Sequence, residues 1–435
     1  WKTGDFQLNM TNPPLMKLVS ALPLIFTSAT LPKLSSNPQN WSLVRQWQFA
    51  REFLYSNRIS GDQILVLARL PIMLISVLLG MYVFIWCREL YGNVPAIFSL
   101  FLYVFSPNIL AHSRLATHDL GLAAFMFITC YYYWKYLHSY KKSYLVLCGI
   151  FMGLAFITKT TAAFLLPVLA VYAVIKAVRE QEKRSFEESN SQNLIKLYRI
   201  GRLSFKNLAW LAAAGIVAAF LLNAGYGFQG TLDPIPVKNP AGLHEKIPFN
   251  KDITEALVKI PVPFPTPYLE LIKFQRSLTK SSGNVFFAGT IYEEGLWYLM
   301  LVSFLIKTPI PMILILCGSL YLMLRRFRTL DAEWLMIIFV IVIFFVFSYL
   351  SNINVGLRYI LPVYPFIHLM AGRFFKDFNL RRKWGGSATV VLCLWYLVAS
   401  LSIQPHYLAY FNELVGGPKN GYKYLVDSNL DWGQD

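Results

Sequence analysis

Charged residues are scarce in this sequence, and their scarcity rules out an ordinary soluble protein. Only 14% of the 435 residues are charged and 56% are hydrophobic, whereas soluble domains carry about 25% charged residues. The apolar residues come in long blocks such as 64–86 and 334–350. Blocks of about 17 to 25 apolar residues match the thickness of the hydrocarbon core of a bilayer. The sequence therefore predicts an all-α protein that crosses the membrane several times.

Cysteine is also rare, and what is missing around it argues against disulfide and metal sites. The five cysteines lie within or beside apolar blocks, and none belongs to a CxxC motif or stands next to a histidine. This pattern predicts neither a disulfide framework nor a zinc site. His112 and His118 are six positions apart, which is not the spacing of a metal pair on a helix. We therefore expect no metal and no cofactor.

The net charge of +17 is explained by topology rather than by nucleic-acid binding. Lysine and arginine gather in alternate loops between the apolar blocks, as in cytoplasmic loops of membrane proteins. We assign those loops to the cytoplasm and expect no nucleic-acid partner. They are Lys141–Lys142, residues 179–206, Arg325–Arg326–Arg328 and Arg381–Arg382–Lys383.

About ten membrane spans are predicted from the apolar blocks, together with two long segments on the non-cytoplasmic side. The blocks are 64–86, 94–111, 119–137, 144–157, 161–178, 207–224, 296–324, 333–350, 358–374 and 387–403, and 296–324 reads as one span or as an interfacial helix followed by a span. The predicted organisation is an outward loop with interfacial helices (1–63), membrane helices (64–224), a large proline-rich outward loop (225–295), membrane helices (296–403) and an outward C-terminal segment (404–435).

Isolated charges in the predicted outward loops are the first candidates for function. Arg114, Lys159 and Arg358 stand on the side that is usually depleted of basic residues, and Asp119 follows the first of them. Ionisable groups near membrane depth often bind ligands, and guanidinium and ammonium groups bind phosphate through charge-assisted hydrogen bonds. The alternative is that each cation reaches toward the lipid headgroups and only fixes the depth of its span. Lys307, beside Pro309, is a fourth candidate.

Several motifs follow one another along the sequence, and together they resemble those of one known family. They are GDFQLN (4–9) followed by NPPL (12–15), PNILAHSRLATHD (107–119), GLAFITKTT (153–161), KTP (307–309), RYILP (358–362) and DSNLDWGQD (427–435). The ordered set resembles the protein O-mannosyltransferase and aminoarabinose transferase superfamily. The last motif is most similar to that of bacterial phospholipid-carrier-dependent glycosyltransferases.

The resemblance implies a GT-C fold, in which a bundle of membrane helices carries interfacial helices over a cavity on the non-cytoplasmic face. It also implies transfer of a sugar from a polyprenyl phosphate to an acceptor hydroxyl, with inversion and without a metal. The family's first span and its catalytic Asp-Glu motif would precede Trp1. We therefore expect the sequence to be part of a longer protein and the 435-residue chain alone to be inactive.

The resemblance also assigns roles to individual residues. Asp119 matches the family's second acidic position, and Asp5 is not a substitute for the upstream base. The expected contacts to the donor phosphate are Lys159, Arg358, Arg114 and Lys307, and weaker contacts to acceptor or donor are expected at His112, His118 and Asn12. Asn12 departs from the pattern, because relatives often have His or Lys there.

Two other functions are compatible with the same residues. A lipid or polyol transporter would line its path with charges, although transporters are often built from repeated halves and no repeat is found. A non-catalytic subunit of a glycosylation complex is the second alternative. For the preferred function, the partners are a polyprenyl-phosphate-linked sugar and an acceptor lipid, glycan or protein. The expected location is a bacterial inner membrane, with the active site facing outward.

Overall fold

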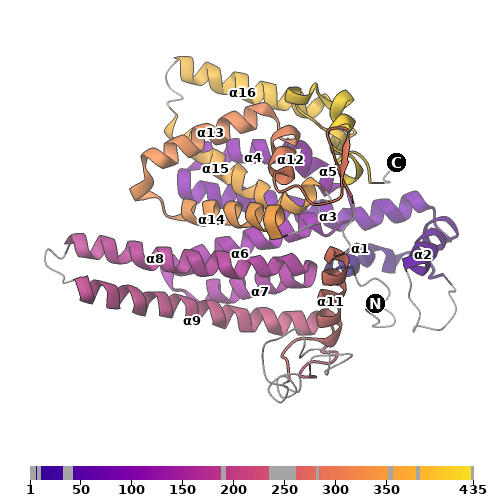
Figure 1. Cartoon of the computed structure of the whole chain (residues 1–435), viewed down its shortest axis with the longest axis horizontal. Helices are drawn as coiled ribbons and strands as arrows, with labels where there is room; N and C mark the ends of the chain where they lie inside the picture. Colours follow the sequence, from indigo (N-terminus) through magenta and orange to yellow (C-terminus); the bar gives the residue numbers. More distant parts are fainter. Residues whose placement is uncertain are drawn as a thin grey trace.

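Apolar helices make up most of the computed structural model, which describes residues 6, 11–32, 43–187, 193–234, 261–280, 284–350, 356–378 and 383–432. Figure 1 shows the helices gathered into one bundle. The described α-helices are α1 (Leu15–Ala21), α2 (Leu43–Tyr55), α3 (Gly61–Tyr91), α4 (Asn93–Val104), α5 (Pro107–Ser113), α6 (Asp119–Ser139), α7 (Lys142–Thr158), α8 (Leu165–Glu187), α9 (Asn193–Gly225), α11 (Thr266–Lys280), α12 (Leu299–Lys307), α13 (Ile310–Arg325), α14 (Ala332–Phe345), α15 (Tyr364–Asp377) and α16 (Lys383–Leu401). The predicted all-α class is confirmed.

The remaining described elements are short. Strands β1 (Val285–Phe287) and β2 (Thr290–Tyr292) form a two-stranded antiparallel hairpin in which Phe286 pairs with Ile291. A 3-10 segment, Leu357–Val363, leads directly into α15. Four further 3-10 turns follow α16, at Tyr407–Ala409, Glu413–Val415, Pro418–Lys423 and Asp427–Asn429.

The helix lengths agree with a multi-pass membrane protein. Among the described residues, three helical stretches are long and apolar enough to cross a bilayer: Gly61–Tyr91, Thr160–Arg184 and Lys196–Gly225. Two bent pairs, α4 with α5 and α12 with α13, raise this number to five if each pair is one span. Every predicted apolar block forms a helix. Fewer than ten pass as complete spans, in part because proline divides some blocks and others form helices of 17 residues or fewer.

Prolines cause the two bends. Pro107 occupies the first turn of α5 after an extended Ser106, and Pro309 follows an extended Thr308 at the end of α12. A residue before proline is pushed out of the helical region, and proline cannot continue the helical hydrogen bonds. The bends measure 60° and 113°, so the block 296–324 is a short helix followed by a separate, longer one.

Close helix packing brings the catalytic candidates of distant segments together. Helix α7 packs between α6 and α9, and two glycines allow α9 to approach it. A Cβ atom on Gly149 would lie 2.7 Å from the Ala214 carbonyl oxygen, and one on Gly153 would lie 2.8 Å from Leu221 Cβ. Helix α6 is buried along most of its length. Its first residue therefore sits inside the bundle.

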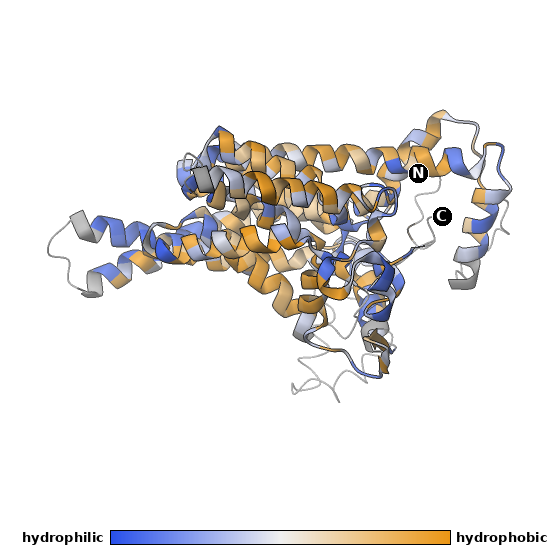
Figure 2. Ribbon diagram, turned by 90° about the horizontal axis from the view of Figure 1, so that it is seen from above, coloured by the Kyte–Doolittle hydropathy of each residue, from blue (hydrophilic) through white to orange (hydrophobic). Residues whose placement is uncertain are grey.

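One end of the bundle collects the segments that lie outside the apolar helices. We call it the site end, and it carries α1, α11 and the C-terminal residues 404–432 (Figure 1). The α8–α9 hairpin extends from the opposite end. Figure 2 shows hydrophobic residues along the bundle and hydrophilic residues toward its ends. Within the predicted loop 225–295, residues 235–260 and 281–283 lie outside the described residues.

Candidate active site

Asp119 and Lys159 are 40 positions apart in the sequence and form a buried ion pair. Lys159 Nζ lies 2.7 Å from Asp119 Oδ1, and the two residues are only 9% and 4% exposed. Asp119 is the first residue of α6, where the N-terminal end of the helix favours a carboxylate. Lys159 follows α7 in an extended conformation. The packing of α7 on α6 thus joins two residues that the sequence predicted separately.

Arg358 lies beside this pair, on the 3-10 segment that precedes α15. Lys159 Nζ is 4.4 Å from the centre of the Tyr359 ring, and Arg358 Cζ is 5.4 Å from the same centre. The positive charges of both side chains act on the Asp119 carboxylate. The structure therefore brings Lys159 and Arg358 to one aromatic ring, with Asp119 paired to Lys159. In the described part of the chain, Arg358 forms no ion pair.

The C-terminal segment places an aromatic side chain against Arg358. Arg358 Cζ lies 4.5 Å from the centre of the Trp432 ring. The centre of the His112 ring lies 6.2 Å from the centre of the same Trp432 ring. A guanidinium over an indole face gains about 0.5–1 kcal/mol at exposed sites and more when it is desolvated. Trp432 therefore lies beside two of the predicted site residues, Arg358 and His112. The motif that contains it continues through 433–435, which lie outside the described residues.

Lys307 holds that segment in place instead of lying against Tyr359. Its Nζ donates hydrogen bonds to the carbonyl oxygens of Leu408, at 2.6 Å, and Asn429, at 2.5 Å, and the residue is 2% exposed. The Asn429 side chain accepts a hydrogen bond from Leu357 N at 3.0 Å. At Gly356, φ is +91° and an added Cβ would lie 2.7 Å from the Asn429 side chain. These contacts lock the C-terminal segment onto the backbone that carries Arg358.

Unpaired polar atoms gather around the same place. Within the described residues, His112 Nδ1, His118 Nε2 and Arg358 Nε are buried and have no hydrogen-bond partner. Leaving such an atom unpaired costs about 1–3 kcal/mol, so these three atoms are candidate contacts for a polar ligand. Burial, together with the charge of Lys17, lowers the pKa of His118 to about 4. His118 is therefore neutral at pH 7.

The segment around Asn12 is tied to the site by α1 and α11. Lys17, in α1, donates a hydrogen bond from Nζ to the Asn12 carbonyl oxygen at 2.7 Å, and burial lowers its pKa to about 8. Gln275 of α11 accepts from Thr160 Oγ1 at 2.5 Å and donates to the Thr11 carbonyl oxygen at 2.6 Å. Helix α11 thus connects the Asn12 segment with the residue that follows Lys159.

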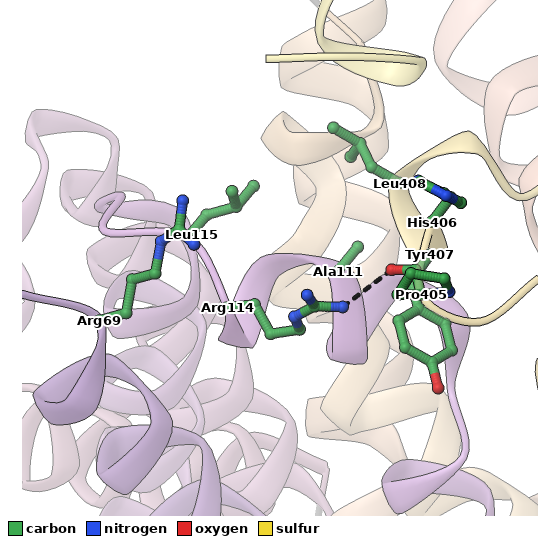
Figure 3. Close-up of a pocket in the computed structure, with 8 residues that line it drawn as sticks. All are labelled: Arg69, Ala111, Arg114, Leu115, Pro405, His406, Tyr407 and Leu408. Atoms are coloured by element: carbon green, nitrogen blue, oxygen red, sulfur yellow. Dashed lines mark hydrogen bonds between the residues drawn. The ribbon is translucent and has the colours of Figure 1, made fainter. Parts of the chain in front are cut away.

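Arg114 lies apart from these residues. It is exposed, and its Nη1 donates to the Pro405 carbonyl oxygen at 2.8 Å. Figure 3 shows it in a pocket that also contains Arg69 of α3. Arg114 has no ion pair or hydrogen bond with Asp119, Lys159 or Arg358 in the described structure. Among the described residues, no group of three or more His, Cys, Asp or Glu side chains is placed to hold a metal ion.

Sequence reasoning missed Tyr359, Trp432 and Lys17 as individual site residues. Tyr359 and Trp432 stand inside motifs that carry the resemblance, but aromatic residues are common throughout the chain, at 16%. Lys17 lies in a short apolar helix where a single cation reads as an interface anchor. Two positions in the sequence could have pointed to these aromatics as site residues. Tyr359 directly follows Arg358, and Trp432 lies within the last motif.

Comparisons with known proteins support the predicted class. Residues 54–187 match the family model described as dolichyl-phosphate-mannose-protein mannosyltransferase, a stretch that includes Arg114, Asp119 and Lys159. A search of curated proteins finds no match. The structure of ArnT from Cupriavidus metallidurans bound to undecaprenyl phosphate is similar, with a TM-score of 0.50 and 15% identity over 92% of this chain and 60% of that one.

Two further solved structures are similar over most of this chain. ArnT from the same organism in the apo state has a TM-score of 0.48 and 16% identity, over 93% of this chain and 67% of that one. The Archaeoglobus fulgidus oligosaccharyltransferase tethered to an acceptor peptide has a TM-score of 0.40 and 13% identity, over 92% of this chain and 49% of that one. The chain has the GT-C fold of the ArnT structure with bound lipid phosphate, which confirms the fold expected from the resemblance, and it spans 60% of the length of that structure.

Proposed function

We propose that this protein transfers a sugar from a polyprenyl-phosphate donor to a hydroxyl group of an acceptor lipid, glycan or protein. The family-model match and the GT-C fold support a glycosyltransferase that uses a lipid-linked sugar. The observation that carries the proposal is the position of Lys159 and Arg358 against one Tyr359 ring, beside Asp119. Two cations that converge in this way match the charge of a phosphate group.

Negative charge grows on the phosphate as the reaction proceeds. The acceptor oxygen attacks the anomeric carbon, the bond from that carbon to the phosphate oxygen breaks, and the electron pair stays on the polyprenyl phosphate. Preorganised cations that contact this oxygen stabilise the transition state more than the ground state. Arg358 and Lys159 supply this charge, so the proposed transfer needs no metal. Attack from the face opposite the phosphate inverts the anomeric configuration.

Asp119 orients Lys159, the cation that faces the phosphate. Asp119 also contacts the acceptor or the donor sugar. In the structure its carboxylate fixes Lys159 Nζ, and a donor phosphate would share that ammonium group. The proton of the acceptor hydroxyl passes to a carboxylate base, which the resemblance places before Trp1. His112 and His118 offer unpaired ring nitrogens to hydroxyl groups of the sugar or acceptor. Lys307 acts through the C-terminal segment that it anchors.

We place the site end on the non-cytoplasmic side of a bacterial inner membrane. The lysine- and arginine-rich stretches 179–187 and 193–206 belong to the end of α8 and the start of α9, which extend from the opposite end of the bundle, and such segments face the cytoplasm. The donor's polyprenyl chain would then lie in the outer half of the bilayer, with its phosphate at the level of Arg358.

Single substitutions in the purified full-length protein test this function. The assay follows sugar transfer from a set of polyprenyl-phosphate sugars to lipid, glycan and peptide acceptors. Arg358→Ala and Lys159→Ala should each lower kcat by about 100- to 1000-fold, the usual cost of removing one stabilising group. Residues 1–435 alone should show no turnover, because the base is proposed to precede them.

The matched control is Lys419→Ala, which removes an exposed lysine from the same C-terminal segment. It should leave turnover and melting temperature unchanged, and Arg358→Ala should keep the melting temperature within a few degrees of the parent. Lys159→Ala should lower it, because Asp119 stays buried without its partner. Wild-type turnover in both Arg358→Ala and Lys159→Ala would refute the phosphate contacts. A parent protein that moves lipid between leaflets and transfers no sugar would support the transporter alternative.

A further inference from the structure

A second cationic pocket lies at the site end, between α3, the end of α5 and the segment after α16. Its volume is about 100 Å³ (Figure 3). It is lined by Arg69, Ala111, Arg114, Leu115, Pro405, His406, Tyr407 and Leu408. Ligand pockets for whole small molecules usually measure about 300–1,000 Å³. This pocket therefore suits a single polar group better than a sugar attached to a lipid.

Two guanidinium groups give the pocket its charge. Arg69 is the only charged residue in the apolar block 64–86, and Figure 3 shows its side chain extending toward Leu115. Arg114 has one nitrogen bound to the Pro405 carbonyl oxygen. No carboxylate lines the pocket, and in the described structure neither arginine has an Asp or Glu partner. An arginine inside an apolar helix is costly unless it has a partner, so it marks a binding site.

The pocket lies where lipid headgroups meet the protein. Arg69 is eight residues after Gly61, the start of α3, which places its Cα about 12 Å along the helix. An arginine side chain can carry its charge several ångströms from there toward the interface. The other walls follow the ends of apolar helices, Ser113 of α5 and Leu401 of α16. Apolar groups such as Leu115 and Leu408 adjoin the two charges, as the glycerol and acyl region of a lipid would require.

The pocket is separate from the proposed donor site. Arg114 is exposed and turned toward Pro405, whereas Asp119 is 4% exposed and paired with Lys159. A donor phosphate held by Lys159 and Arg358 would therefore leave the two arginines of this pocket unused. We propose that Arg69 and Arg114 bind the phosphate of an anionic phospholipid from the surrounding leaflet. The bound lipid thus connects α3 with residues 405–408, the segment that follows α16.

Native mass spectrometry of the full-length protein tests this assignment without any sugar donor, so its result is independent of the proposed transfer. The protein is titrated in detergent with phosphatidylglycerol, with zwitterionic phosphatidylcholine and with a polyprenyl phosphate. The parent should retain phosphatidylglycerol in preference to phosphatidylcholine. Arg69→Gln and Arg114→Gln should each weaken phosphatidylglycerol binding about tenfold, because each removes charge-assisted hydrogen bonds. Arg69→Lys keeps the charge and should retain most of the binding.

Arg58→Gln is the matched control, since Arg58 is an exposed arginine just before α3 and outside the pocket. It should bind phosphatidylglycerol like the parent. Arg114 is at the surface, so Arg114→Gln gives a folded variant for comparison if Arg69→Gln lowers the melting temperature. Equal phosphatidylglycerol binding by the parent and Arg114→Gln would overturn the proposal. So would a loss confined to polyprenyl phosphate, which would assign the pocket to the donor instead.

Discussion

Lys17 has the chemistry of a phosphate-binding residue that titrates close to physiological pH. Burial lowers its pKa from 10.5 to about 8, and its charge acts on His118 at the edge of the site. If its ammonium group contacts the donor phosphate, kcat/KM should fall as the pH rises through about 8, because the group loses its charge there. kcat/KM reports groups of the free enzyme. A pH profile of sugar transfer by the full-length protein measures this limb.

Lys17→Arg identifies the group, because a guanidinium keeps its charge at any pH that the assay can use. The alkaline limb should move above pH 10 in this variant, while the values below pH 7 stay within about tenfold of the parent. His118, with a pKa of about 4, should contribute no limb between pH 6 and 9. An alkaline limb that stays at pH 8 in Lys17→Arg belongs to another group and removes Lys17 from the donor site.

Individual cations of the site could be predicted, but their partners could not. Lys159 and Arg358 were recognisable because each is isolated in a predicted outward loop and lies in a motif. The ion pair between Lys159 and Asp119 depends on the way α7 packs on α6, and a separation of 40 positions carries no information about it. Arg69 was overlooked because a lone cation inside an apolar block reads as an irregularity in a span. Arg69 becomes a candidate binding residue only because the fold places it in the same pocket as Arg114.

At the scale of helices, a buried network ties α14 and α15 to the end of α3. Arg373 Nη1 lies 3.0 Å from Glu333 Oε1 and its Nε lies 2.6 Å from Asp377 Oδ2. Tyr91 donates to the same Glu333 oxygen at 3.0 Å. Removing one partner of a buried ion pair costs about 3–5 kcal/mol, since the other charge stays buried. Asp377 remains with Arg373, so Glu333→Ala should cost about 3 kcal/mol of unfolding free energy.

Chemical unfolding of the purified protein in detergent measures this change. The control is Glu180→Ala, which breaks an ion pair with Arg184 four residues along α8, where the arginine side chain is 61% exposed. Exposed pairs of this kind contribute about 0.5 kcal/mol or less. A loss for Glu333→Ala no larger than that of the control would mean that the network adds nothing to the packing of α14 on α15.

The helices themselves were largely predictable, but their exact lengths and bends were less so. Each apolar block forms a helix because its length and lack of charge leave no other stable structure in a bilayer. Pro309 lies at the break offered as one reading of the block 296–324, whereas the bend at Pro107 was not predicted, because 94–111 was read as a single span. Helix α11 was not predicted, since its residues lie within a loop read from its prolines as irregular. Its Gln275 bonds Thr11 and Thr160, and these three residues lie in three separate parts of the sequence, so the contacts could not be predicted.

At the scale of the whole molecule, the C-terminal segment completes a site whose other residues come from the first half of the bundle and from the segment before α15. Lys307 was predicted to bind phosphate, whereas its ammonium group here binds the carbonyl oxygens of Leu408 and Asn429. These two roles have different consequences. A phosphate ligand would affect only catalysis and donor binding. An anchor would also affect how firmly residues 405–432, including Trp432, are held against Arg358.

Lys307→Met separates the two roles, because methionine fills similar space but cannot donate hydrogen bonds. For an anchor, two buried carbonyl groups lose their partner and the segment opens more often. Hydrogen–deuterium exchange of the full-length protein without donor should then be at least about tenfold faster across 405–432, since exchange follows the free energy of local opening. Exchange in α6 and α7 should not change. Unaltered exchange in 405–432 together with a large rise in KM for the donor would instead assign Lys307 to the phosphate.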